Sequence, residues 1–193
     1  MHETAALQRY NHLAMLFHWL IALFILFNLA VGFFMEGWQQ PLRARVVGLH
    51  ASFGMSVLGL ALLRVLWRLA RRPPELHPSL LRWERQLAQA VHVALYVLMF
   101  ALPITGWAFL SCHPLSPRSG VHIFDLFTIP PLMPFTALAP PEQKQTHDLL
   151  VEVHAAGAWF LIGLLVLHLA GALKHQFIDG QPALARMGLG RMR

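Results

Sequence analysis

The chain has 193 residues, of which 56% are hydrophobic and 12% charged, and its formal net charge is +6. A soluble domain usually carries about a quarter charged residues, so this composition excludes an ordinary water-soluble domain and favours one membrane domain. The positive charge flanks apolar runs and forms no continuous stripe, which argues against nucleic acid as a partner. A single cysteine, Cys112, excludes an internal disulfide.

Four apolar runs are long enough to cross about 30 Å of hydrocarbon at about 1.5 Å per residue. They cover approximately residues 13–35, 46–70, 87–110 and 149–173. The first run contains His18 and has no clean small-residue cleavage site after it, so we interpret it as a span and not as a signal peptide. The sequence therefore predicts an all-α membrane protein, a single-domain four-transmembrane-helix bundle over residues 1–193.

The connection between the third and fourth spans is predicted over residues 111–148 and holds seven of the thirteen prolines. It is apolar in places, notably at residues 123–129. Two interpretations stay open. The connection either packs on the membrane face or caps the bundle, or it is a variable surface loop.

Lysine and arginine are distributed unequally between the two sides of the predicted bundle. The side that carries both termini has eleven of them and the other side has four. Basic residues are retained in the cytoplasm, so both termini are predicted to be cytoplasmic. The eleven are Arg9, Arg64, Arg68, Arg71, Arg72, Arg82, Arg85, Lys174, Arg186, Arg191 and Arg193, and the four are Arg43, Arg45, Arg118 and Lys144.

Six of the twelve histidines lie in or beside the predicted spans, where an ionisable group is costly and indicates a function. His154 and His168 are fourteen residues apart. At that separation they lie within about 40° of one helix face and about 21 Å apart along the axis. This spacing suits two metal centres stacked through the membrane. The six are His18, His50, His92, His154, His168 and His175.

Matching depth in the bilayer pairs His18 with His168 near the inner side and His50 with His154 near the outer side. Two neutral imidazoles from facing helices can bind one haem iron, so the pairs predict two haems. Covalent attachment is excluded because the sequence has no Cys-x-x-Cys-His. His92 lies at a depth similar to that of His18, and spacing alone does not exclude it as the partner of His168.

Three glycines follow the candidate ligands by three or four residues, namely Gly54, Gly157 and Gly171. Residues at these offsets lie beside the ligand on the same helix face. They predict either room for a flat macrocycle or ordinary packing of small residues between membrane helices.

Three cationic residues on the inner side are further candidates. Arg64 follows His50 by fourteen residues, so it either faces the bundle and pairs with a haem propionate or snorkels to the interface. Lys174 and His175 lie just beyond the fourth span. They are candidate donors to a quinone carbonyl, with simple interfacial anchoring as the alternative.

Four short stretches, taken in order, resemble the bacterial cytochrome b561 family over nearly the whole chain. They are Phe17-His18-Trp19, Gly48-Leu49-His50-Ala51-Ser52-Phe53-Gly54, Ala101-Leu102-Pro103-Ile104-Thr105-Gly106, and His154 with Leu167-His168. The resemblance implies a four-helix bundle in the bacterial cytoplasmic (inner) membrane with two haem b. It also implies ligands on the first, second and fourth spans, which favours His18 over His92.

Members of this family pass electrons between an outer-side reactant and membrane quinone, and some oxidise superoxide and reduce ubiquinone. The resemblance therefore implies a membrane oxidoreductase, and the basic outer residues could attract an anion such as superoxide. An alternative is an anchor subunit that relays electrons for a separate dehydrogenase or hydrogenase, its partner redox protein. A haem-free transporter with a proton relay is less favoured, because Asp and Glu are absent from the span interiors.

Overall fold

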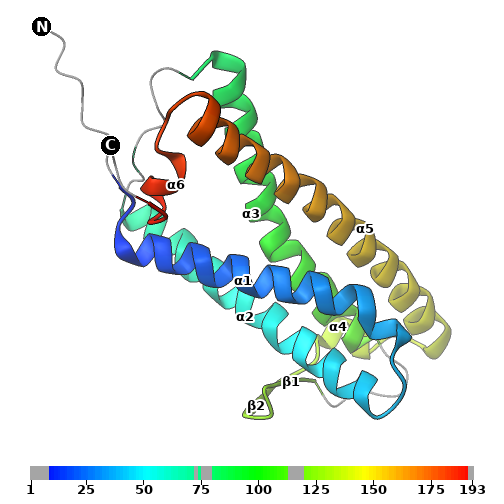
Figure 1. Cartoon of the computed structure of the whole chain (residues 1–193). Coiled ribbons are helices and arrows are strands. Elements are labelled where there is room, and N and C mark those ends of the chain that lie inside the picture. The colour runs from blue at the N-terminus through cyan, green and yellow to red at the C-terminus, as the bar shows by residue number, and fades with distance from the viewer. Residues whose placement is uncertain (1–8, 72–73, 75–79, 113–119, 191–193) are drawn as a thin grey trace, which may run out of the picture.

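The computed structural model describes residues 9–71, 74, 80–112 and 120–190. Within these residues, four long helices are apolar and long enough to cross a membrane (Figure 1). They are α1 (His12–Phe34), α2 (Leu42–Ala70), α3 (Arg82–Ser111) and α5 (Pro140–Leu173). A 3₁₀ turn, η1 (Met35–Gly37), extends α1, and a π-helical turn, η2 (Lys174–Ile178), extends α5. The predicted four-span helical architecture is confirmed.

Three of the helices, α2, α3 and α5, are longer than the predicted spans, because their polar ends lie beyond the apolar runs that mark a span in the sequence. The largest difference is at α5, which begins at Pro140 and takes in residues that were predicted as loop. Proline is tolerated in the first turn of a helix, where its missing N–H costs no hydrogen bond. Glu142 accepts from the backbone N–H of Ala139 at 3.4 Å and closes the helix start.

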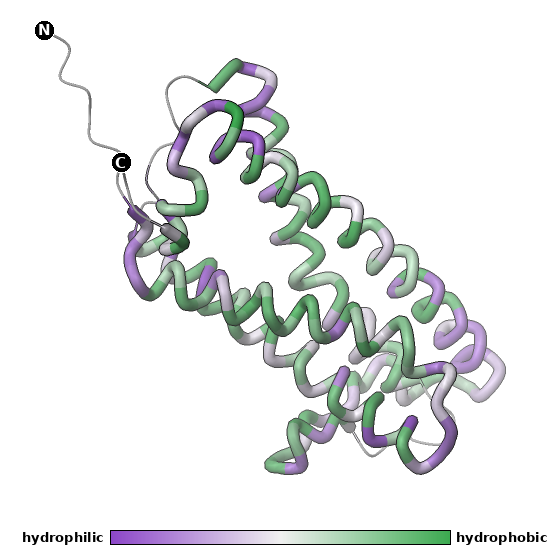
Figure 2. The backbone as a smooth tube through the Cα atoms, viewed as in Figure 1, coloured by the Kyte–Doolittle hydropathy of each residue, from purple (hydrophilic) through white to green (hydrophobic). Residues whose placement is uncertain are grey.

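The long helices form two pairs, with α1 packed on α2 and α3 packed on α5, and α2 also contacts α3 (Figure 1). One buried cluster joins the first three of these helices, and a second joins α3 to α5. Figure 2 shows mostly hydrophobic residues along the four helices and more hydrophilic ones toward their ends. The clusters are Ile21, Val57, Ala61 and Met99, and Val91, Leu98, Leu161 and Leu164.

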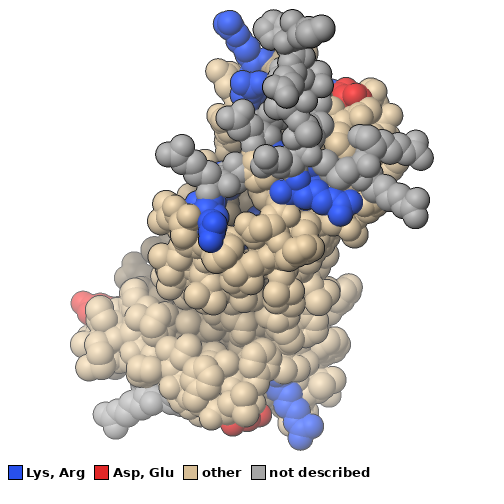
Figure 3. All heavy atoms as spheres, turned by 90° about the vertical axis from the view of Figure 1, so that its left-hand side faces the viewer, with Lys and Arg blue, Asp and Glu red and all other residues tan. Residues whose placement is uncertain are grey.

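Both termini of the described chain lie at one end of the bundle, which we call the termini end (Figure 1). The backbone N–H of Tyr10 donates to the carbonyl of Arg186, in the short helix α6 (Ala183–Arg186), at 3.1 Å. The indole of Trp19 donates to the carbonyl of Met187 at 2.9 Å. Most of the Lys and Arg side chains visible in Figure 3 lie in the half of the molecule that carries this end.

The opposite end, which we call the hairpin end, carries a β-hairpin, so the description all-α is incomplete. Strand β1 (Val121–Ile123) pairs antiparallel with β2 (Phe127–Ile129), and the short helix α4 (Met133–Thr136) follows. β1 packs on α2, and the indole of Trp107 on α3 donates to the carbonyl of Pro130 at 3.0 Å. The predicted connection therefore caps the bundle in its described part.

Ser52 on α2 fastens the hairpin to the bundle. Ser52 is buried, and its hydroxyl accepts from the N–H of Phe124 at 3.0 Å. The hydroxyl hydrogen lies between two carbonyls that can accept it, that of Gly48 in α2 at 2.8 Å and that of His122 in the hairpin at 3.0 Å. Ser52→Ala would remove the acceptor of the Phe124 N–H and a donor near the His122 carbonyl, so we expect it to lower the stability by about 1 kcal/mol. Thermal unfolding in detergent measures this loss.

Ser56→Ala is the matched control, because the Ser56 hydroxyl only donates within α2, to the carbonyl of Ser52 at 2.8 Å. Equal midpoints of thermal unfolding for Ser52→Ala and Ser56→Ala would contradict the role given to Ser52. Faster proteolysis of the hairpin in Ser52→Ala alone would support it.

Candidate functional site

Four histidines meet in two pairs, each between the α1–α2 pair of helices and α5. The ring centroids of His18 and His168 are 6.2 Å apart, with 62° between the ring planes. Those of His50 and His154 are also 6.2 Å apart, with 64° between the planes. All four residues are half-buried. The first pair lies toward the termini end and the second toward the hairpin end, in the combinations that depth predicts.

The spacing of both pairs can be compared with that of two imidazoles in line across one metal ion. A bond from a metal to an imidazole nitrogen is about 2.0–2.1 Å. A five-membered ring with bonds of about 1.35 Å places each atom about 1.15 Å from its centre, so two such rings have centroids about 6.4 Å apart. The observed 6.2 Å fits that arrangement in both pairs.

His92 on α3 lies beside the termini-end pair. Its ring centroid is 5.2 Å from that of His168, at 74°, and the residue is exposed where His18 and His168 are half-buried. The separation is shorter than two in-line ligands need. The geometry therefore supports His18 as the partner of His168 and leaves His92 as a neighbour of the pair.

Arg64 on α2 points toward the histidines and is half-buried. Its Nη1 donates to Nδ1 of His18 at 3.1 Å, and its guanidinium lies 5.5 Å from the ring centre of Tyr96. Of the two predicted placements, the structure has the one that faces the bundle. The positive charge of Arg64 thus lies next to the termini-end pair.

The glycines that contact histidine rings are not those singled out in the sequence. A Cβ at Gly32 would lie 3.4 Å from Cε1 of His50, and one at Gly106 would lie 3.3 Å from Cε1 of His154. A Cβ at Gly157 would lie 2.9 Å from Leu102, so that glycine serves helix packing, and one at Gly171 would meet nothing within 4 Å. The offset of a glycine from a ligand along one helix does not predict which glycine of a different helix contacts that ligand.

Thr105 on α3 is a further residue that the ligand spacing did not reveal. Its Oγ1 lies 3.1 Å from Nδ1 of His154. His50 differs, because its Nδ1 is a buried atom with no hydrogen-bond partner in the described part of the chain. Both Thr105 and Gly106 lie in the short stretch Ala101–Gly106. That stretch lies at the same depth as His154, and this was the feature of the sequence that could have pointed to the two residues.

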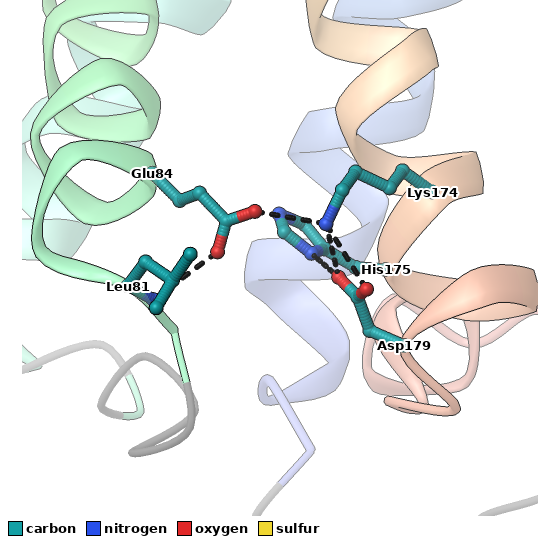
Figure 4. A network of polar contacts seen from close by, with 5 residues as sticks. All are labelled: Leu81, Glu84, Lys174, His175 and Asp179. Atoms are coloured by element: carbon teal, nitrogen blue, oxygen red, sulfur yellow. Dashed lines mark hydrogen bonds and ion pairs between the residues drawn. The ribbon is translucent and has the colours of Figure 1, made fainter.

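Lys174 and His175 belong to a network of charged groups at the termini end (Figure 4). Nζ of Lys174 donates to Glu84 at 2.8 Å and to Asp179 at 2.8 Å, and Nδ1 of His175 lies 2.7 Å from Asp179. These hydrogen bonds, from Lys174 first and then His175, hold the pKa of the Asp179 carboxyl below its usual range. The network joins the start of α3 to the end of α5, so anchoring is one role of these residues.

Comparison with known proteins identifies the family of the chain. A family model described as prokaryotic cytochrome b561 matches residues 9–190. Cytochrome b561 homolog 2 of Escherichia coli is 32% identical, over 97% of this chain and 95% of its own length. A Yersinia pestis protein named probable superoxide oxidase CybB is 28% identical, over 93% and 96% respectively. The chain therefore belongs to the prokaryotic cytochrome b561 family.

Proposed function

We propose that this chain, a haem b protein of a membrane electron-transfer family, holds two haems and carries electrons from an outer-side donor to membrane quinone. The proposal rests on two histidine pairs that lie at different depths along α5. In both pairs the ring centroids are 6.2 Å apart. Two redox centres about 21 Å apart along one helix would connect the two faces of the membrane.

His50 and His154 would hold the hairpin-end haem, and His18 and His168 the termini-end haem. Bound haem iron supplies reversible one-electron transfer, while the protein sets its ligands, hydrogen bonds and surroundings. The helices hold each imidazole in place. Arg64 would pair with a propionate carboxylate. Arg64 would then no longer donate to Nδ1 of His18. That nitrogen could carry the ring proton, which leaves the lone pair of Nε2 free to bind a metal.

The termini end would face the cytoplasm, because basic residues are retained on that side. The hairpin end would then face the outside, where the donor arrives. Superoxide is the donor we propose, since one relative is named a probable superoxide oxidase. Arg43 and Arg45 are exposed at this end and would attract an anion. Lys144 is ion-paired with Asp148, and Arg118 lies outside the described residues.

Quinone would be reduced at the termini end, beside Lys174 and His175. Asp179 accepts from both side chains, and these hydrogen bonds lower the pKa of its carboxyl further below neutral pH. An imidazole held by a carboxylate through Nδ1 presents Nε2 as a proton donor or acceptor. His175 would in this way pass protons from the cytoplasm to the reduced quinone.

Haem content and reconstituted activity test the proposal. The chain purified alone in detergent, with adequate haem supply, is expected to show a reduced b-type spectrum and two haems per chain. It is also expected to reduce ubiquinone when superoxide is generated in the same solution. One haem or none would overturn the two-site arrangement. Quinone reduction only in the presence of a co-purifying redox enzyme would identify an anchor subunit instead.

The charge of Arg64 gives a separate prediction. A cation beside a haem favours the reduced iron, so we expect Arg64→Gln to lower the potential of the termini-end haem by tens of millivolts. About 59 mV corresponds to a tenfold change in a one-electron equilibrium. Potentiometric titration measures it. Arg68→Gln is the control, because Arg68 is exposed although it too lies over Tyr96. Equal shifts in both variants would argue against a specific role for Arg64.

A further inference from the structure

The hydroxyl of Thr105 has three polar neighbours. Oγ1 lies 2.9 Å from the carbonyl of Ala101, 2.9 Å from that of Leu102, and 3.1 Å from Nδ1 of His154. A hydroxyl has one hydrogen to donate and two lone pairs that accept. The two carbonyls can only accept, so they take the hydroxyl hydrogen. Toward His154 the oxygen then acts as an acceptor, and the carbonyl of Leu102 is a second acceptor beside the same ring.

This arrangement fixes the tautomer of His154. An acceptor at Nδ1 requires that the ring carry its proton on that nitrogen, which leaves the Nε2 lone pair free. Nε2 is then the atom able to bind a metal. Nδ1 of His50 has no side-chain partner among the described residues, and the backbone of Asn28 is the polar group beside that ring. The two histidines of the hairpin-end pair thus differ in how they are held.

The local sequence of α3 explains why the contact forms. The Thr105 hydroxyl bonds back to carbonyls of the preceding turn, which holds its oxygen toward His154. Gly106 lets the ring of His154 come close to α3. A Cβ at that position would lie 3.3 Å from Cε1 and 3.6 Å from Nδ1 of His154, so a side chain there would press the ring away.

We propose that Thr105 is a positioning residue for His154 and lowers the reduction potential of the hairpin-end haem. The inference rests on the proposed function, in which His154 is an axial ligand. A hydrogen bond accepted from Nδ1–H makes the imidazole a stronger electron donor through Nε2. Stronger donation stabilises the oxidised iron more than the reduced iron, and the potential falls.

The test compares Thr105→Val with Thr105→Ser in the haem-loaded full chain in detergent. Valine keeps the branched shape and removes the hydroxyl, whereas serine keeps the hydroxyl. We expect both haems to remain in each variant. In Thr105→Val the potential of the hairpin-end haem should rise, and the electron paramagnetic resonance spectrum of that ferric haem should change. The termini-end haem should be unaffected, and Thr105→Ser should resemble the wild type in both measurements.

Several outcomes would separate this inference from the proposed function. Unchanged potentials in Thr105→Val, with both haems present, would overturn the role of Thr105 and leave the two-haem proposal intact. Equal shifts in the valine and serine variants would show that the hydroxyl is not the cause. If His154→Ala keeps both haems, the proposed function itself fails.

Discussion

Replacing His50 or His154 with alanine is expected to remove one of the two proposed haems and leave the other. Each residue would supply one of two axial bonds, and the remaining imidazole cannot hold the macrocycle in the same geometry. His18→Ala and His168→Ala are expected to remove the other haem. Haem content should fall from about two to about one per chain in each single variant. The pyridine haemochrome assay on purified protein measures it, and redox titration identifies which haem is left.

His92→Ala is the matched control for these variants. The ring centroid of His92 is 5.2 Å from that of His168, which is closer than two imidazoles bound to opposite sides of one metal ion would be. We expect it to keep both haems. If His92→Ala removes a haem while His18→Ala does not, the pairing at the termini end is wrong. Recovery of haem on adding free imidazole to the ligand variants would show that the missing bond, and not a folding defect, caused the loss.

Residue numbers were sufficient to predict two levels of histidines, and the reason is geometric, although at the termini end only the family resemblance favoured His18 over His92. A span has a fixed rise and turn per residue, so depth and face follow from residue numbers alone. His154 and His168 on α5 thus define two levels, and the rings of His50 and His18 are found opposite them. The bilayer restricts the possible folds, because backbone groups in hydrocarbon must be paired within helices.

Contacts between elements could not be predicted in the same way. The hairpin is held by Ser52, seventy residues away from His122, and no local pattern encodes that meeting. Gly106 and Thr105 touch His154 across two helices, so the offsets along α5 do not reveal them. The start of α5 at Pro140 was missed because a helix can continue beyond the hydrocarbon with polar residues, where hydropathy gives no signal.

The double variant Lys174→Gln, His175→Gln is expected to keep both haems and to slow electron transfer from reduced haem to quinone. Loss of a positioned proton donor typically costs about 10²–10⁴-fold in rate, and we expect a decrease of at least tenfold here. Stopped-flow reoxidation of the reduced protein by a short-chain ubiquinone isolates this step from the reaction of the outer-side donor. Lys144→Gln is the charge control, since it breaks a Lys–Asp pair at the other end of α5.

Anchoring and quinone chemistry must be separated, because Lys174 also joins α5 to Glu84 on α3. Glu84→Gln weakens that link and leaves the Lys174–Asp179–His175 contacts in place. We expect Glu84→Gln to reoxidise at nearly the wild-type rate. If it is as slow as the double variant, the residues act through helix packing and the quinone site lies elsewhere. If both variants are fast, Lys174 and His175 have no part in quinone reduction, and the proton must enter by another route.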